Sequence, residues 1–96
     1  MFRLTVEAVE HVESIYEFTV DRFGEYQAEA YVAGLKHTFE LLADFPLMGA
    51  AAFELAPELR RFRYQAHYIF YTPTTDCVVI RAVLHTKRDI RRDIFE

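Results

Sequence analysis

The chain has 96 residues, of which 52% are hydrophobic and 16% aromatic, and its formal net charge at pH 7 is −4. This length predicts one domain with a single core, spanning residues 1–96, and the apolar content excludes a disordered chain. No apolar stretch approaches the roughly 20 residues that a membrane span requires, the start lacks the pattern of a signal peptide, and the only cysteine, Cys77, excludes an intrachain disulfide. We therefore expect a soluble cytoplasmic protein.

The charges are distributed unevenly along the chain. Residues 1–58 carry eleven acidic and three basic side chains, a net charge of −8, whereas residues 59–96 carry four acidic and eight basic ones, a net charge of +4. This split predicts two different faces. A chain that is acidic overall is a poor general binder of nucleic acid, because such binding needs excess positive charge to displace counterions. We therefore expect no direct sequence-specific binding of nucleic acid.

The first half of the sequence has helical periodicity. A short strand at residues 3–5 is expected to open the chain. Apolar side chains then recur every three or four residues from Val6 to Phe23, which predicts an amphipathic helix. Thr5 is suited to cap its N-terminus, and Gly24 is suited to end it.

A second helix follows almost without a gap. Its apolar stripe runs from Ala28 to Leu42, and Pro46 ends it. Because the connection is so short, the two helices are expected to be antiparallel neighbours. A turn at residues 46–49 and a loop at residues 50–58 come next.

The pattern then changes to that of strands. Strands are expected at Arg61–Tyr64, His67–Tyr71 and Cys77–Leu84, with a hairpin turn between the last two. Lys87–Phe95 is a short charged tail with some helical character. The plan is an α+β fold with an N-terminal strand, an antiparallel helix hairpin packed on one face of a small antiparallel sheet, and a short charged C-terminal tail or helix.

The sequence carries no pattern of a catalytic, metal or cofactor site. Its three glycines are too scattered for a phosphate-binding loop, and its four histidines lack the spacing of metal ligands. His67 and His85 lie on strands expected to be adjacent, so the two side chains are expected to meet. A hydrogen-bonded histidine at a strand end is favoured here over a catalytic base.

Basic side chains gather in the second half of the chain. On alternating strand positions, Arg61 and Arg63 should share one face of the sheet while Phe62 and Tyr64 share the other. The four basic residues of the tail would cluster on about one helical turn if the tail is helical. Guanidinium groups suit carboxylates and phosphates. The candidate target-binding residues are Arg60, Arg61, Arg81, His85, Lys87, Arg88, Arg91 and Arg92.

Several segments, in this order and spacing, resemble the ParE toxins of the RelE/ParE superfamily. They comprise a helix-hairpin pattern, a proline–glycine turn, a central strand, and a closing leucine–histidine pair before basic residues and an aspartate. The segments are Ile15–Thr19, Arg22–Gly24, Gln27–Tyr31, Phe45–Gly49, Leu59–Arg60, His67–Tyr71 and Val83–Asp89.

The resemblance implies a fold shared with the RelE ribonucleases, a type II toxin–antitoxin system and a target, DNA gyrase, that is inhibited by protein binding. It also implies a ParD-like antitoxin, whose C-terminal segment is expected to wrap the toxin as helix and extended chain. An apolar groove between the helix hairpin and the sheet is the expected dock.

Two alternatives stay open at this point. The first is a RelE-like ribosome-dependent mRNA endonuclease, with Arg61, Arg81 and His85 as its residual site. The absence of lysine and arginine between Lys36 and Arg60 and the acidic overall charge argue against it. The second is an inactive module that only binds its antitoxin.

Overall fold

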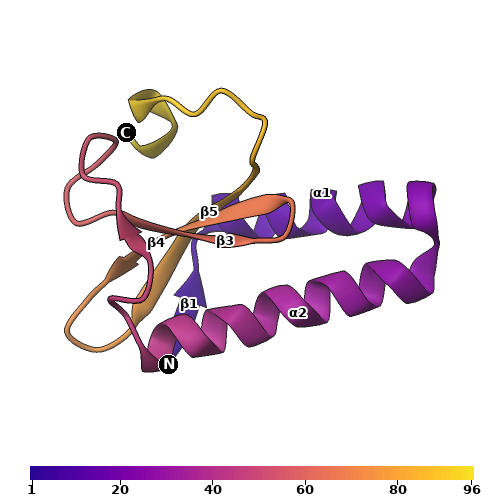
Figure 1. Ribbon diagram of the computed structural model, residues 1–96, viewed down its shortest axis with the longest axis horizontal. Coiled ribbons are helices and arrows are strands. Elements are labelled where there is room, and N and C mark those ends of the chain that lie inside the picture. The colour runs from indigo at the N-terminus through magenta and orange to yellow at the C-terminus, as the bar shows by residue number, and fades with distance from the viewer.

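The computed structural model describes residues 1–96 and confirms the predicted α+β fold, with a pair of helices beside one sheet (Figure 1). The elements are β1 (Phe2–Leu4), α1 (Val6–Phe23), α2 (Glu25–Asp44), β2 (Ala50–Ala51), β3 (Arg60–Tyr64), β4 (His67–Pro73), β5 (Val78–His85) and a 3₁₀ helix, η1 (Arg92–Phe95). None of the helices has the length and apolar character to cross a membrane.

Local chemistry fixes both ends of α1. The side chain of Thr5 accepts a hydrogen bond from the backbone N–H of Ala8 at 3.1 Å, which confirms the predicted N-cap. Gly24, with φ of 91°, ends α1 and precedes α2 directly. Because one glycine makes the whole connection, the two helices run back along each other and extend beyond the sheet (Figure 1).

The sheet has the strand order β1-β5-β4-β3-β2. It is mixed, and not wholly antiparallel as the sequence suggested, because β1 pairs in parallel with Val78–Ile80 of β5. An antiparallel sheet was expected because strands that are neighbours in sequence pair through hairpins. β1 instead pairs with β5, which lies near the other end of the chain. The long connection through both helices allows this parallel pairing.

Strand β2 was expected to be part of a loop. Its two residues, Ala50 and Ala51, pair with Arg61 and Arg60 of β3. Alanine has a low preference for strands, so the local pattern carries no sign of this short edge strand.

Both faces of the sheet are covered. The face toward the helices carries the larger core, which includes Leu35 and Phe39 of α2. The opposite face has a smaller core, which consists of Ala52, Leu59, Phe70, Ala82 and Leu84.

The C-terminal tail is part of this second core. Ile90, Ile94 and Phe95 pack against it, and Phe95 lies 5.1 Å from Phe70 between ring centroids. Only Arg92–Phe95 is helical, as one short 3₁₀ segment. The basic residues of the tail therefore do not share a helical turn, because packing of the apolar side chains sets the path of this segment and it is too short for a stable helix by itself.

A close contact between α2 and the end of β3 positions the site described next. A Cβ atom at Gly34 would overlap the hydroxyl of Tyr64. Glycine therefore lets Tyr64 lie against α2, where its ring packs edge-on to Tyr31 with centroids 5.2 Å apart. This contact places Tyr31 beside the start of β4.

Candidate functional site

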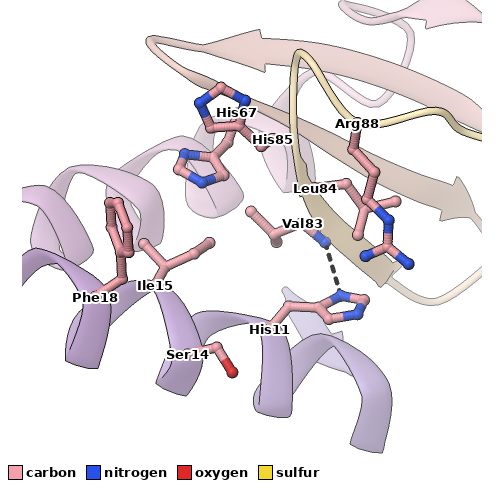
Figure 2. A pocket seen from close by; sticks show the side chains of 9 residues that line it. All are labelled: His11, Ser14, Ile15, Phe18, His67, Val83, Leu84, His85 and Arg88. Carbon is pink, nitrogen blue, oxygen red and sulfur yellow. Dashed lines mark hydrogen bonds between the residues drawn. The ribbon is translucent and has the colours of Figure 1, made fainter.

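A pocket of about 400 Å³ lies between α1 and the ends of two strands, where β4 begins and β5 stops. Figure 2 shows helix side chains on one side and strand side chains on the other. The lining residues are His11, Ser14, Ile15, Phe18, His67, Val83, Leu84, His85 and Arg88.

The pocket exists because β1 is short. β1 pairs only with Val78–Ile80, so the rest of β5 has no strand on that edge. Side chains take the place of a strand there. The hydroxyl of Thr5 donates to the carbonyl of Arg81 at 3.2 Å, and the backbone N–H of Val83 donates to Nδ1 of His11 at 3.2 Å (Figure 2). Beyond His11 the edge of β5 stays open.

His67 and His85 are partners in the β4–β5 ladder, and their rings are 5.4 Å apart between centroids. The prediction that they meet is confirmed. The hydroxyl of Tyr31 lies 2.6 Å from Nδ1 of His67 and 3.4 Å from the carbonyl of Tyr64. Because a tyrosine has one hydroxyl proton, we assign it to the nearer acceptor, His67. The imidazole is thus hydrogen-bonded at a strand end, as expected.

All three imidazoles of the pocket have the same hydrogen-bonding arrangement. Nδ1 accepts from Val83 N–H in His11 and from Lys87 N–H in His85, and with the hydroxyl proton assigned as above it accepts from Tyr31 in His67. A neutral imidazole whose Nδ1 accepts carries its proton on Nε2. Each of the three rings therefore presents an N–H donor at its tip.

The pKa values agree with neutral rings at two of the three positions. Burial, with the nearby His85 as a second cause, lowers the pKa of His67 to about 4. Burial and then the positive charge of Arg88 lower the pKa of His11 from its ordinary value. At neutral pH the fixed positive charge of the pocket is the guanidinium of Arg88.

Comparisons with known proteins show the family of the chain. Residues 2–90 match the family described as the ParE toxin of the type II toxin–antitoxin system parDE. The chain belongs to the ParE toxin family.

Named members of the ParE family are similar over nearly their whole length. Toxin ParE1 of Mycobacterium tuberculosis strain H37Rv is 33% identical over 94 residues, which cover 97% of this chain and 96% of the relative. Toxin ParE1 of Caulobacter vibrioides is 31% identical over 90 residues, which cover 94% and 93%. The chain is therefore a ParE-type toxin of a toxin–antitoxin system, and such a system includes an antitoxin partner.

A solved structure shares the fold. A chain of the chromosomal ParDE toxin–antitoxin system from P. aeruginosa superposes with a TM-score of 0.78, covering 90% of this chain and 95% of that one. The sequence identity is 16%, so this likeness concerns the fold alone.

The pocket brings together only two of the eight residues named from the sequence, His85 and Arg88. Arg60 and Arg61 lie elsewhere on the sheet. Arg60 donates to the carbonyl of Gly49 at 2.6 Å, and the guanidinium of Arg61 lies over the ring of Tyr68 at 5.2 Å. Both arginines are thus engaged by their own surroundings.

Arg81 anchors the tail. Its guanidinium donates to the hydroxyl of Thr72 and to the carbonyl of Phe95, both at 3.3 Å. Arg81 and His85 are four positions apart on β5, which is about 13 Å along a strand. Arg61, Arg81 and His85 therefore do not converge on one reacting centre.

The remaining basic candidates, Lys87, Arg91 and Arg92, are exposed on the tail. Arg91 pairs with Asp89 at 2.9 Å, and both side chains are 74% exposed. Such a pair stabilises the fold little.

Sequence reasoning missed the helix side of the pocket, His11, Ser14, Ile15 and Phe18 as a group. A signal was present in the spacing of positions 11, 15 and 18, which places them on one helical face. Which strand end faces that stripe is a matter of tertiary structure.

Proposed function

We propose that residues 1–96 form a toxin domain that inhibits DNA gyrase in the cytoplasm by binding to it, without catalysing a reaction, and that a ParD-like antitoxin neutralises it. Membership of the ParE family is the observation that carries this proposal. The dispersal of Arg61, Arg81 and His85 supports a binding function over the nuclease alternative.

The test is a paired assay on the purified protein. Gyrase supercoiling with a readout of cleaved complexes is measured beside cleavage of mRNA on translating ribosomes. Gyrase inhibition with intact mRNA is the expected result. Cleaved mRNA with unaffected gyrase would make the chain a nuclease. Absence of both gyrase inhibition and mRNA cleavage, together with unimpaired growth on expression, would make it an inactive antitoxin-binding module.

The antitoxin is proposed to dock in the groove that contains the histidine-lined pocket. The apolar side chains of Ile15 and Val83 line the groove, and Phe18 at its rim is 58% exposed. An exposed aromatic ring beside an apolar cavity suits the apolar face of a partner segment.

Replacing Phe18 by alanine is therefore expected to weaken antitoxin binding by about tenfold or more, as measured by isothermal titration calorimetry. The control is Phe45→Ala, because Phe45 is 61% exposed at the opposite end of the helix hairpin. If both variants bind the antitoxin like the wild type, the groove is the wrong dock.

The exposed basic residues of the tail are proposed to engage gyrase. Arg88 belongs to the pocket, so the informative variant changes only Lys87, Arg91 and Arg92 to glutamine. Because these charges lie together on one exposed segment, their loss is expected to raise the concentration for half-inhibition of gyrase about tenfold. The measurement is the supercoiling assay, and antitoxin binding should stay unchanged.

A matched control removes the same number of positive charges elsewhere. Arg3, Arg22 and Lys36 are exposed and lie in the first half of the chain, and their substitution by glutamine should leave inhibition unchanged. Equal inhibition by both triple variants, each correctly folded, would contradict a role for the tail.

A further inference from the structure

The polar side chains that line the pocket are almost all hydrogen-bond donors. The three imidazoles present Nε2–H groups, because their Nδ1 atoms already accept bonds from Val83, Tyr31 and Lys87. Arg88 adds a guanidinium, which has only donors and is outside the one salt bridge of the chain. No carboxylate is among the lining residues. The pocket lining thus offers positive charge and donors without a carboxylate of its own, although Glu7 and Glu10 lie near His11.

This arrangement selects against a metal ion. Metal ligation needs an unprotonated ring nitrogen, and each Nδ1 lone pair is already used while each Nε2 carries the proton. A ligand that brings acceptors, above all a carboxylate, fits the same atoms without disturbing any existing hydrogen bond.

The rest of the lining is apolar. Ile15 and Phe18 of α1 lie on the same side of the sheet as Val83 (Figure 2). A small inorganic anion would leave this surface in water, whereas a ligand with an aliphatic or aromatic group beside its carboxylate would bury it. The pocket is therefore suited to an amphipathic acid.

The open strand edge favours a peptide among such acids. The N–H of Val83 points away from β4 toward His11. Since the N–H and C=O of one residue in an antiparallel strand point to the same side, and alternate residues share a side, the carbonyl of Val83 and the N–H of His85 face this edge as well. They are one acceptor and one donor of the kind that a peptide backbone satisfies.

We propose that the pocket recognises an acidic peptide segment of the protein partner. An aliphatic or aromatic side chain of the segment packs on Ile15 and Phe18, and the carboxylate of a neighbouring aspartate or glutamate binds the guanidinium of Arg88 and an imidazole Nε2–H. This inference rests on the proposed antitoxin partnership. It adds to that partnership the kind of segment that the pocket binds, an apolar side chain next to a carboxylate. The strand side of the pocket and Arg88 come from residues 59–96, whose net charge is +4, while the α1 side comes from the acidic half of the chain, so the guanidinium of Arg88 is the group that selects the acid.

The first test uses a small probe and the free protein. Isocaproate combines a branched alkyl chain with a carboxylate, and isocaproamide has the same shape without the charge. In ¹⁵N NMR spectra, the imidazoles of His11, His67 and His85 should show protonated Nε2, and isocaproate should shift these signals together with Nε–H of Arg88. We expect isocaproamide to bind about tenfold more weakly, the effect of losing a charge-assisted hydrogen bond. Protonated Nδ1 atoms, or equal responses to the two probes, would overturn the inference.

The second test uses the antitoxin complex. Arg88→Gln and Arg91→Gln remove the same charge from exposed positions three residues apart, but only Arg88 lines the pocket. Arg88→Gln is expected to weaken antitoxin binding about tenfold, while Arg91→Gln leaves it unchanged. If both variants bind like the wild type, the inference fails and the antitoxin partnership stands. If even the wild type forms no complex, the proposed partnership fails. The titration with isocaproate and isocaproamide then decides whether the pocket binds a carboxylate that carries an alkyl group.

Discussion

Replacing Tyr71 by phenylalanine is expected to lower the free energy of unfolding by about 2–4 kcal/mol, because two hydrogen bonds are lost and a buried group is left without a partner. Tyr71 is 0% exposed. Its hydroxyl donates to the carbonyl of Pro46 at 2.8 Å and accepts from the N–H of Gly49 at 2.9 Å. One hydroxyl thus holds the turn between α2 and β2 against the sheet.

The neighbouring turn residue explains why this contact is so close. A Cβ atom at Gly49 would lie 2.6 Å from the hydroxyl of Tyr71 and 2.7 Å from the carbonyl of Arg61. The turn can therefore approach the strand this closely only with glycine at position 49.

Urea unfolding followed by circular dichroism measures this effect. Tyr68→Phe is the matched control, because Tyr68 is on the same strand and only partly buried, so losing its hydroxyl should change stability by less than about 0.5 kcal/mol. Equal stabilities of the two variants would show that the turn does not depend on Tyr71.

Acidification is expected to destabilise the fold through His67. The pKa of His67 is lowered to about 4 by burial and then by the nearby His85, from an ordinary value of 6.5. As the pH falls below about 6.5, the unfolded chain takes up a proton that the folded chain still excludes, so stability is lost progressively down to about pH 4. Allowing for the solvent that reaches this half-buried ring, the loss is about 2 kcal/mol.

The comparison that isolates this contribution is the wild type against His67→Gln. Glutamine can still accept from the hydroxyl of Tyr31, which lies 2.6 Å from Nδ1 of His67, but it does not titrate. Between about pH 7 and pH 4 the wild type should lose about 2 kcal/mol more stability than the variant in urea unfolding. If the free energies of unfolding of the two proteins fall in parallel with pH, protonation of His67 does not destabilise the fold.

Most of the fold was predictable because its signals are local. The helix Val6–Phe23 was predicted with its bounds, since Thr5 and Gly24 act within a few residues of its ends. The strands of the second half were found to within a few residues, the first from its polar–aromatic alternation and the second from its run of aromatic and β-branched residues. The meeting of His67 and His85 also followed from sequence, since a short hairpin connects their strands.

The site was much less predictable. Sequence reasoning named Arg88 for its charge and His85 for its strand position, but it grouped both with basic residues that the structure holds elsewhere, such as Arg60 on Gly49 and Arg81 on Phe95. The tail was predicted as a short charged tail or helix, whereas Ile90, Ile94 and Phe95 fix its path by covering the second face of the sheet.

By itself, then, the sequence determined the order of helices and strands, the caps, the uneven charge and the family resemblance, because each of these depends on neighbouring residues or on their order. Only the tertiary structure decided that β1 pairs in parallel with β5 and stops early, so that His11 meets Val83 and a donor-lined pocket opens beside them. The physical reason is that the pairing between chain ends and the hydrogen bonds to His11 and His67 join residues more than 30 positions apart, as between Tyr31 and His67. Such contacts are selected by the packing of the whole core, which no local pattern encodes.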